Sequence, residues 1–355
     1  MPRFERPSRE ATAHLQRIVA ALRCPPRYHE RPCRVEVIET HLAWVFLTDA
    51  HAYKLRKPVR TRLIDYSTVE ARREACETEL RLNRRLAAPV YRAVVPITKT
   101  GSAIRVEGGG RAIEWMVKMD RLPRARMLDT CIAEETVPRA PIRHLGAKLS
   151  AFYERAIPLG WSADTYVGRI AANVKSKGNA LTNARYGLDA DEVRSVVAQL
   201  LRWIDEHRPL LGPRGAHVLD AHGDLRPEHV CLTAPPMVID CLDFNRSLRL
   251  LDPLSDLAFL SLETSRLGAG WVGERLIGHY RTRTGDDAPG PLVRFYESYH
   301  ALIRATIAIW HLDDEGVRHP ERWRGQARTY LRLARERMAP YPSAHSASDR
   351  SVCRR

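Results

Sequence analysis

The sequence predicts an α+β fold in which a small strand-rich part precedes a larger helical part. Up to about residue 120, five short β-type runs surround one amphipathic helix, and five segments with helical periodicity dominate the remainder. With 355 residues, 44% of them hydrophobic and 28% charged, the chain has ordinary globular composition and enough length for a sizeable core. We expect an N-terminal helix and lead-in over 1–30, a strand-rich lobe over 31–120, a helical lobe over 121–340 and a disordered polar tail over 341–355.

The strand-rich lobe follows a helix at about residues 11–23, which ends because proline at 25 and 26 cannot continue it. Five β-type runs are predicted, at residues 34–38, 42–48, 51–56, 93–98 and 112–119. A tight hairpin is expected at residues 48–51. Ser67 and Glu70 form a predicted capping box that opens a helix running to about Ala87.

Helical periodicity then appears at residues 141–156, 191–207, 253–266, 290–311 and 321–338. Two short β-like stretches interrupt these helices, around 217–221 and 237–242. The last helix carries an apolar stripe and many arginines. We interpret it as a packed helix with a solvated arginine face; the alternative is contact with nucleic acid or a membrane surface.

Charge and cysteine content limit the classes of function. The formal net charge of +15 favours polyanions, nucleotides or phosphorylated ligands as partners. The seven cysteines are scattered without a Cys-x-x-Cys pair, which argues against a disulfide framework and a zinc site. No apolar run reaches the ~20 residues needed to span a bilayer, and the N-terminus lacks the apolar core of an export signal. We therefore expect a cytoplasmic protein with no membrane partner.

The residues most typical of catalysis lie at 222–229 (His-Gly-Asp-Leu-Arg-Pro-Glu-His), followed by Asp240 at the end of a short apolar run. Phosphoryl transfer needs a carboxylate that orients the attacking hydroxyl, oxygen ligands for a metal on the phosphates, and a cation near the transferred group. A loop that bears Asp224, followed by a strand that ends in Asp240, supplies the first two.

These residues resemble the catalytic loop and metal motif of the aminoglycoside phosphotransferase-like kinases, and residues 224–228 are similar to the Asp-Leu-Lys-Pro-Glu run of protein kinases. A bacterial group of this family, some members of which are fused to a P-loop ATPase domain, is more similar still. The matching runs lie at 39–47, 52–58, 79–86, 240–245 and 256–260, with Asp252, in the family's order. No Gly-x-x-x-x-Gly-Lys-Ser/Thr occurs, so the ATPase half is expected to be absent.

The resemblance, over about residues 30–312, implies a protein-kinase-like two-lobed fold and phosphorylation of a small-molecule hydroxyl by ATP or GTP. It implies that Asp224 is the catalytic base, that Asp240 binds Mg²⁺ and that Lys54 holds the α- and β-phosphates. Glu79 would orient Lys54, and Arg226 would lie near the γ-phosphate.

Further roles are implied for residues around the nucleotide. Val117 and Met119 would belong to a hinge, residues 117–119, against which adenine packs and whose backbone groups contact the edge of the base. Thr40 and His41 occupy the turn where the family has a glycine-rich phosphate loop. His229 stands where the family has an asparagine metal ligand; because Mg²⁺ prefers oxygen and imidazole suits softer metals, His229 implies Mn²⁺ binding, a water in its place, or lost activity.

Most of these assignments have a structural alternative. Lys57 is an alternative to Lys54 as the lysine that holds the phosphates. Glu74 and Glu77 are alternatives to Glu79 as the carboxylate that orients this lysine. Arg226 is alternatively a surface charge. His222 is expected to be a hydrogen-bonding residue behind the loop. Asp243 and Asp256 are expected to cap or brace loops, the alternative being metal ligation.

Two other classes of function stay open. One is a catalytically weak or inactive kinase-like protein that binds nucleotide in a regulatory role, which His229 favours. The other is a basic protein associated with nucleic acid, which the net charge favours. Aminoglycosides are polycations that a +15 protein repels at long range, and no residue pattern identifies another acceptor or an oligomeric state.

Overall fold

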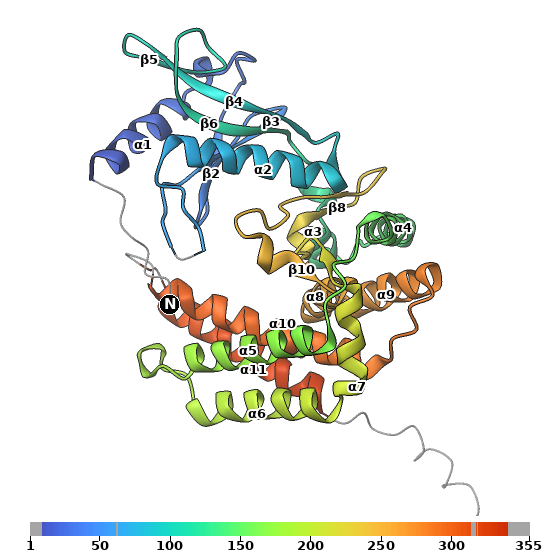
Figure 1. Cartoon of the computed structure of the whole chain (residues 1–355). Coiled ribbons are helices and arrows are strands. Elements are labelled where there is room, and N and C mark those ends of the chain that lie inside the picture. Colours follow the sequence, from blue (N-terminus) through green and yellow to red (C-terminus); the bar gives the residue numbers. More distant parts are fainter. Residues whose placement is uncertain (1–8, 62, 314–316, 318, 340–355) are drawn as a thin grey trace, which may run out of the picture. The chain divides into compact units, whose positions relative to one another are not determined.

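The computed structural model describes residues 9–61, 63–313, 317 and 319–339 (Figure 1). These residues form two compact units, one from the described parts of 1–161 and 214–288 and the other from the described parts of 162–213 and 289–355. Helices and antiparallel strands are both present, which confirms the predicted α+β class. The predicted tail at 341–355 lies outside the described residues.

The first unit contains a six-stranded antiparallel sheet in the order β1-β2-β3-β6-β4-β5. In chain order the strands are β1 (Glu36–Glu39), β2 (Ala43–Leu47), β3 (His51–Arg56), β4 (Tyr91–Thr100), β5 (Ala103–Val106) and β6 (Arg111–Asp120). Five strands were expected, and β5 is the sixth. It pairs with β4 across the two-residue turn Gly101-Ser102, where Gly101 adopts a left-handed φ of 58°.

A helix packs on each face of this sheet. Apolar side chains of α1 (Arg9–Leu22), among them Leu15 and Ile18, join a core with Tyr53 and Leu55 of β3. Side chains of α2 (Val69–Ala87) join a second core on the opposite face, which carries the alternate residues of β3. Lys54 therefore points toward α2.

The start of α2 corrects one prediction. Its N-cap is Thr68, whose Oγ1 accepts the Ala71 amide at 3.1 Å. Ser67, the expected cap, instead donates its amide and its hydroxyl to Asp65, at 3.0 Å and 2.6 Å. Because Ser67 is hydrogen-bonded in the turn at Asp65, the N-cap lies one residue later than predicted. The predicted hairpin at 48–51 is present: the Thr48 amide donates to the His51 carbonyl at 2.9 Å.

The rest of the first unit is mainly helical. It contains α3 (Leu128–Ala133), α4 (Arg139–Arg155), α8 (Pro253–Arg266) and α9 (Gly270–Thr284), with short pairs β7 (Leu219–Asp220) with β10 (Leu250–Leu251) and β8 (Val230–Cys231) with β9 (Met237–Val238). The sequence did not predict α9. Its Gly273 lies against Ser261 of α8, and a Cβ on Gly273 would lie only 2.4 Å from the Ser261 Oγ. Glycine is unfavourable in a helix, but here it lets the two helices pack closely.

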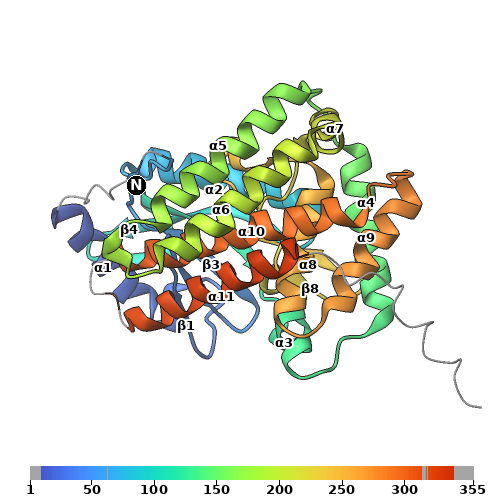
Figure 2. The ribbon, with the colours of Figure 1, turned by 90° about the horizontal axis from the view of Figure 1, so that it is seen from below.

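The second unit is helical. It contains α5 (Ala163–Leu181), α6 (Ala190–Glu206), α7 (Arg208–Leu211), α10 (Gly290–Trp310) and α11 (Pro320–Met338). Figures 1 and 2 both show α5, α6, α10 and α11 side by side. On α11, Ala327, Leu331 and Ala334 are buried, and Ser298 of α10 donates to the Ala334 carbonyl at 2.8 Å. The expected packed helix at 321–338 is confirmed.

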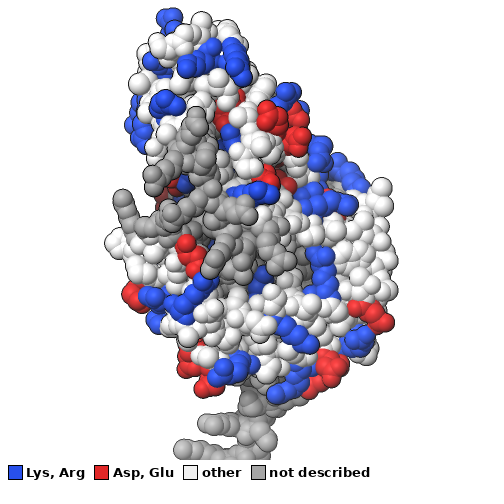
Figure 3. Space-filling view, turned by 60° about the vertical axis from the view of Figure 1, so that its left-hand side comes forward, with Lys and Arg blue, Asp and Glu red and all other residues white. Residues whose placement is uncertain are grey.

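Figure 3 shows Lys and Arg interspersed with Asp and Glu on one face rather than gathered into one continuous basic patch. Among the described residues, no helix has the length and apolar character needed to cross a membrane.

Candidate active site

Lys54, Glu79 and Asp240 meet in the first unit, although they come from β3, α2 and the segment after β9. Lys54 Nζ donates to Glu79 Oε1 at 3.0 Å and to Asp240 Oδ1 at 2.6 Å. The alternative residues that the sequence offered for Lys54 and Glu79 lie outside this cluster. Lys57 Nζ pairs with Glu39 at 2.6 Å, and Glu74 and Glu77 are exposed on α2. The cluster therefore contains the residues that the resemblance implies.

Arg56 is a member of this cluster that the sequence analysis missed. Its guanidinium donates to Glu79 Oε2 at 2.5 Å, to the Tyr66 hydroxyl at 2.8 Å, and to Asp243. Asp243 thus braces the cluster, as expected. The signal for Arg56 was available, because residues two apart in a strand share a face and Arg56 follows Lys54 by two. Glu79 is held between two cations.

The charges in the cluster stabilise one another. Burial disfavours the Lys54 ammonium, but the carboxylates of Asp240 and Glu79 outweigh it and raise the pKa of Lys54 well above its usual value. Burial likewise disfavours the Asp240 carboxylate, yet Lys54 and His229 hold the pKa of Asp240 below its usual range. Both groups are therefore ionised at neutral pH.

The loop that bears Asp224 places its side chain beside Arg226 and His229. Arg226 donates to both carboxylate oxygens of Asp224, at 2.9 Å and 3.1 Å. His229 Nδ1 lies 2.8 Å from the Asp224 carbonyl, so this nitrogen carries the proton and donates. The lone pair of His229 is then on Nε2, which lies 3.5 Å from Asp240 Oδ2 and 3.2 Å from Arg226 Nη2.

Asp256 of α8 holds this loop from behind. Its wholly buried carboxylate accepts the backbone amides of His222 and Gly223 and the Tyr153 hydroxyl, each at 3.0 Å. Gly223 has a φ of 81°, and a Cβ there would lie 2.7 Å from the Arg249 Cβ. Asp256 therefore braces the loop, as the sequence analysis expected.

His222 is a structural residue of the same loop. Its Nε2 lies 3.0 Å from the Ile239 carbonyl, and its Nδ1 accepts the Asp224 amide at 3.3 Å. Only the neutral tautomer with the proton on Nε2 satisfies both contacts. Burial is the main reason that the pKa of His222 falls to about 3.

Lowering the pH is expected to destabilise the fold through His222. Because its folded-state pKa of about 3 lies below the unfolded value of about 6.5, only the unfolded chain takes up the proton between these values. The contribution to stability is complete above about pH 6.5 and is lost at about 1.4 kcal/mol per pH unit toward pH 3. Urea unfolding should therefore show a loss of roughly 2 kcal/mol from this group between about pH 6.5 and about pH 4.5.

A pair of variants isolates this effect. His222→Gln is expected to lose that part of the pH dependence, whereas His144→Gln, at an exposed histidine of the same unit, should keep it. A His222→Gln protein with the same pH dependence as the wild type would contradict the assignment.

Four further residues that the resemblance implies for nucleotide binding lie in the sheet or in the turn between its first two strands. Thr40 and His41 form the exposed turn between β1 and β2, and the Thr40 amide donates to the Ala43 carbonyl at 2.8 Å. Val117 and Met119 are buried in β6, on the face that carries Lys54, and pair with β3 and β4 on either side. Their nucleotide contacts stay predictions.

The donor atoms suit a metal that is shared with a phosphorylated ligand. One oxygen of Asp240 accepts from Lys54, and the other faces His229 Nε2. Among the described residues, no group of three or more His, Cys, Asp or Glu side chains is arranged to hold a metal. Mg²⁺ at phosphoryl-transfer sites typically takes one or two carboxylates and completes its shell with phosphate oxygens and water, so Asp240 fits that role.

Comparison with known sequences gives relatives without a described function. No protein-family profile matches the chain. Uncharacterized proteins of Mycobacterium tuberculosis and Mycobacterium bovis are 30% identical over 280 residues, which is 77% of this chain and 54% of theirs. The chain therefore spans about half the length of the curated relatives it matches.

Solved structures show the fold. A choline/ethanolamine kinase family protein from Mesorhizobium loti matches with a TM-score of 0.51 at 16% identity, over 91% of this chain and 95% of that chain. An ethanolamine kinase of Plasmodium vivax matches with a TM-score of 0.50 at 11% identity, over 86% of this chain and 84% of that chain. The predicted protein-kinase-like fold is confirmed.

Proposed function

We propose that this chain, which has the fold of the choline/ethanolamine kinase family protein, is a phosphotransferase that moves the terminal phosphate of ATP or GTP to a hydroxyl of a small molecule. The observation that carries this proposal is the bridge from Lys54 to Glu79 and Asp240, beside the loop that bears Asp224. Such a site acts by positioning and by electrostatic stabilisation.

Each charged residue has a distinct task in this proposal. Lys54, fixed by Glu79, binds the α- and β-phosphates. Asp224 orients the acceptor hydroxyl and takes its proton as the hydroxyl oxygen bonds to the γ-phosphorus. The bond from that phosphorus to the β–γ bridging oxygen breaks, and the nucleoside diphosphate leaves. Arg226, which is paired with Asp224, would offset charge on the transferred group.

Asp240 and His229 would hold the metal that accompanies the nucleotide. A bound Mg²⁺ or Mn²⁺ neutralises charge on the phosphate oxygens. The Nδ1–H of His229 is fixed on the Asp224 carbonyl, so Nε2 is the nitrogen that would bind the metal, in exchange for its present contact with Arg226 Nη2 at 3.2 Å. Imidazole in this place favours Mn²⁺ over Mg²⁺ more than an amide oxygen would.

Replacing His229 with asparagine is expected to shift the metal preference toward Mg²⁺. We expect ATP or GTP to raise the melting temperature only when a divalent metal is present. For each metal, we measure the concentration that gives half of this rise in melting temperature. In His229→Asn, the ratio of the Mg²⁺ concentration to the Mn²⁺ concentration should fall by about tenfold. Thermal-shift titration with Mg²⁺, Mn²⁺ or a chelator measures the ratio.

His144→Asn makes the same change at an exposed histidine and should leave the ratio unaltered. An unaltered ratio in His229→Asn would mean that His229 does not touch the metal. A nucleotide-induced rise that persists in chelator would instead favour the regulatory, non-catalytic alternative. Binding of an oligonucleotide with a steep salt dependence, without any nucleotide effect, would favour the nucleic-acid alternative. The cytoplasmic location stays a prediction.

A further inference from the structure

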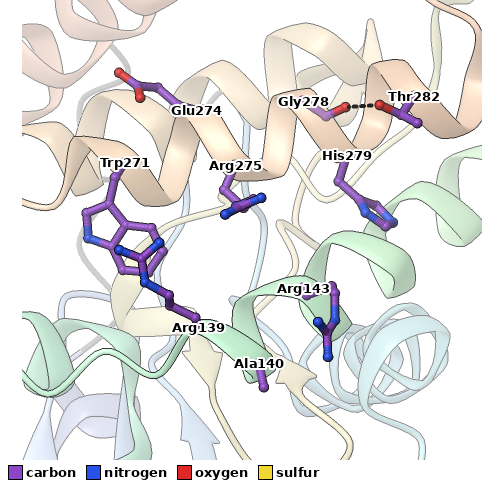
Figure 4. A pocket seen from close by; sticks show the side chains of 9 residues that line it. All are labelled: Arg139, Ala140, Arg143, Trp271, Glu274, Arg275, Gly278, His279 and Thr282. Carbon is purple, nitrogen blue, oxygen red and sulfur yellow. Dashed lines mark hydrogen bonds between the residues drawn. The ribbon is translucent and has the colours of Figure 1, made fainter.

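An open pocket of about 880 Å³ lies in the first unit, between the first turn of α4 and one side of α9 (Figure 4). It shares no lining residue with the Lys54–Asp240 cluster. A pocket of this size matches those that hold small molecules. Nothing in the proposed phosphotransfer uses it.

Helical spacing gathers basic and aromatic side chains in this pocket. Trp271, Arg275 and His279 are four residues apart and form one stripe along α9. Arg139 and Arg143 are likewise four apart on α4. Figure 4 shows the α9 stripe projecting toward α4; Glu274 also lines the pocket, although its carboxylate points away from that stripe in this view. Three guanidinium groups therefore line one pocket.

No carboxylate among the described residues pairs with these guanidinium groups. Arg143 and Arg275 form no ion pair within the described part of the chain, and Arg139 lies over the Trp271 ring, 5.4 Å from its centroid. Like charges repel, and no described carboxylate offsets Arg143 and Arg275, whereas several other surface arginines are paired, as Arg124 is with Asp129 at 2.6 Å.

Two other groups add hydrogen-bond donors or positive potential to the pocket. Helix α4 begins after Pro138 without a side-chain cap, so the amides of its first turn add positive potential at the pocket. The buried Nε2 of His279 has no hydrogen-bond partner within the described chain, and it would donate to a ligand in the tautomer that carries the proton there. The charge and the shape suit an anionic ligand.

We propose that this pocket is a second ligand site, which binds a small phosphorylated molecule carrying at least two negative charges. Guanidinium groups match phosphate oxygens in pairs, so Arg143 and Arg275 would bind the phosphates from the two helices. The Trp271 ring offers a flat apolar surface for the organic part of the ligand. The site is independent of the catalytic cluster.

Calorimetric titration with inorganic pyrophosphate tests this proposal on the full chain. The double variant Arg143→Gln/Arg275→Gln removes two charges from exposed positions, and a melting curve verifies its fold. The double variant Arg194→Gln/Arg332→Gln removes the same charge from exposed ion pairs on α6 and α11. Lys54→Met removes the cation of the proposed catalytic site.

We expect one pyrophosphate-binding event to be at least tenfold weaker in Arg143→Gln/Arg275→Gln, the pocket variant. Arg194→Gln/Arg332→Gln, the charge control, and Lys54→Met should retain that event. The proposal is overturned if the pocket variant binds as the wild type does, or if the charge control loses as much affinity. It is also overturned if the wild type binds no pyrophosphate, or if Lys54→Met alone abolishes binding. Citrate bound as tightly as pyrophosphate would refute the preference for phosphate.

Discussion

Asp256→Ala is expected to destabilise the protein by about 3 to 5 kcal/mol, because the variant leaves two backbone amides, one buried and one part-buried, and a buried hydroxyl without their acceptor. Those amides belong to His222 and Gly223, directly before Asp224. The third donor, the Tyr153 hydroxyl, is also buried and loses its partner. Urea unfolding at neutral pH measures the loss.

Two variants calibrate this result. Tyr153→Phe removes one of the three donors and keeps the carboxylate, so about 1 kcal/mol is expected. Asp191→Asn breaks an exposed ion pair with Arg194 and should change stability by no more than about 0.5 kcal/mol. If Asp256→Ala unfolded like Asp191→Asn, the bracing role would be wrong.

The same experiment separates bracing from metal ligation. If Asp256 were a metal ligand, Asp256→Ala would keep its stability in the absence of ligand and would lose metal-dependent nucleotide binding. The geometry favours bracing, because both carboxylate oxygens already accept hydrogen bonds from the loop and from Tyr153.

Features that depend on neighbouring residues were predictable from the sequence. The hairpin at 48–51 and the helices at 253–266 and 321–338 follow from turn chemistry and helical periodicity. Elements whose glycines serve tertiary packing were missed. In α5, Gly178 faces Val197 of α6, where a Cβ would come within 2.7 Å, and such a requirement is invisible before the helices are packed.

In the candidate active site too, contacts between residues close in sequence were predictable, and contacts between distant residues were not. Asp224, Arg226 and His229 are close in sequence, and their proximity in space follows from one short loop. The meeting of Lys54, Glu79 and Asp240 was implied only by the family resemblance. The strand spacing from Lys54 places Arg56 on the same face, but its pairing with Glu79 and Asp243 could not be predicted, because both lie far away in sequence.

Asp224→Asn is expected to lower the rate of phosphotransfer by about 10³-fold, because the amide cannot take the proton of the acceptor hydroxyl. Asparagine keeps the size of the side chain and an oxygen that accepts from Arg226. Nucleotide binding through Lys54 and Asp240 should therefore stay within about threefold of the wild type.

Asp129→Asn is the matched control. It makes the same substitution in another aspartate that pairs with an arginine through both oxygens, Arg124 at 2.6 Å and 3.2 Å, outside the proposed site. We expect it to transfer phosphate at the wild-type rate.

The most direct test of the proposed function is a single-turnover measurement of γ-phosphate transfer from labelled ATP or GTP, with water and a panel of small hydroxylated molecules as acceptors. Nucleotide affinity is measured on the same samples. We predict transfer by the wild type and by Asp129→Asn, and transfer about 10³-fold slower by Asp224→Asn with nucleotide still bound. Equal rates in Asp224→Asn and the wild type, or a wild type that binds nucleotide and transfers phosphate to no acceptor, would contradict the proposal.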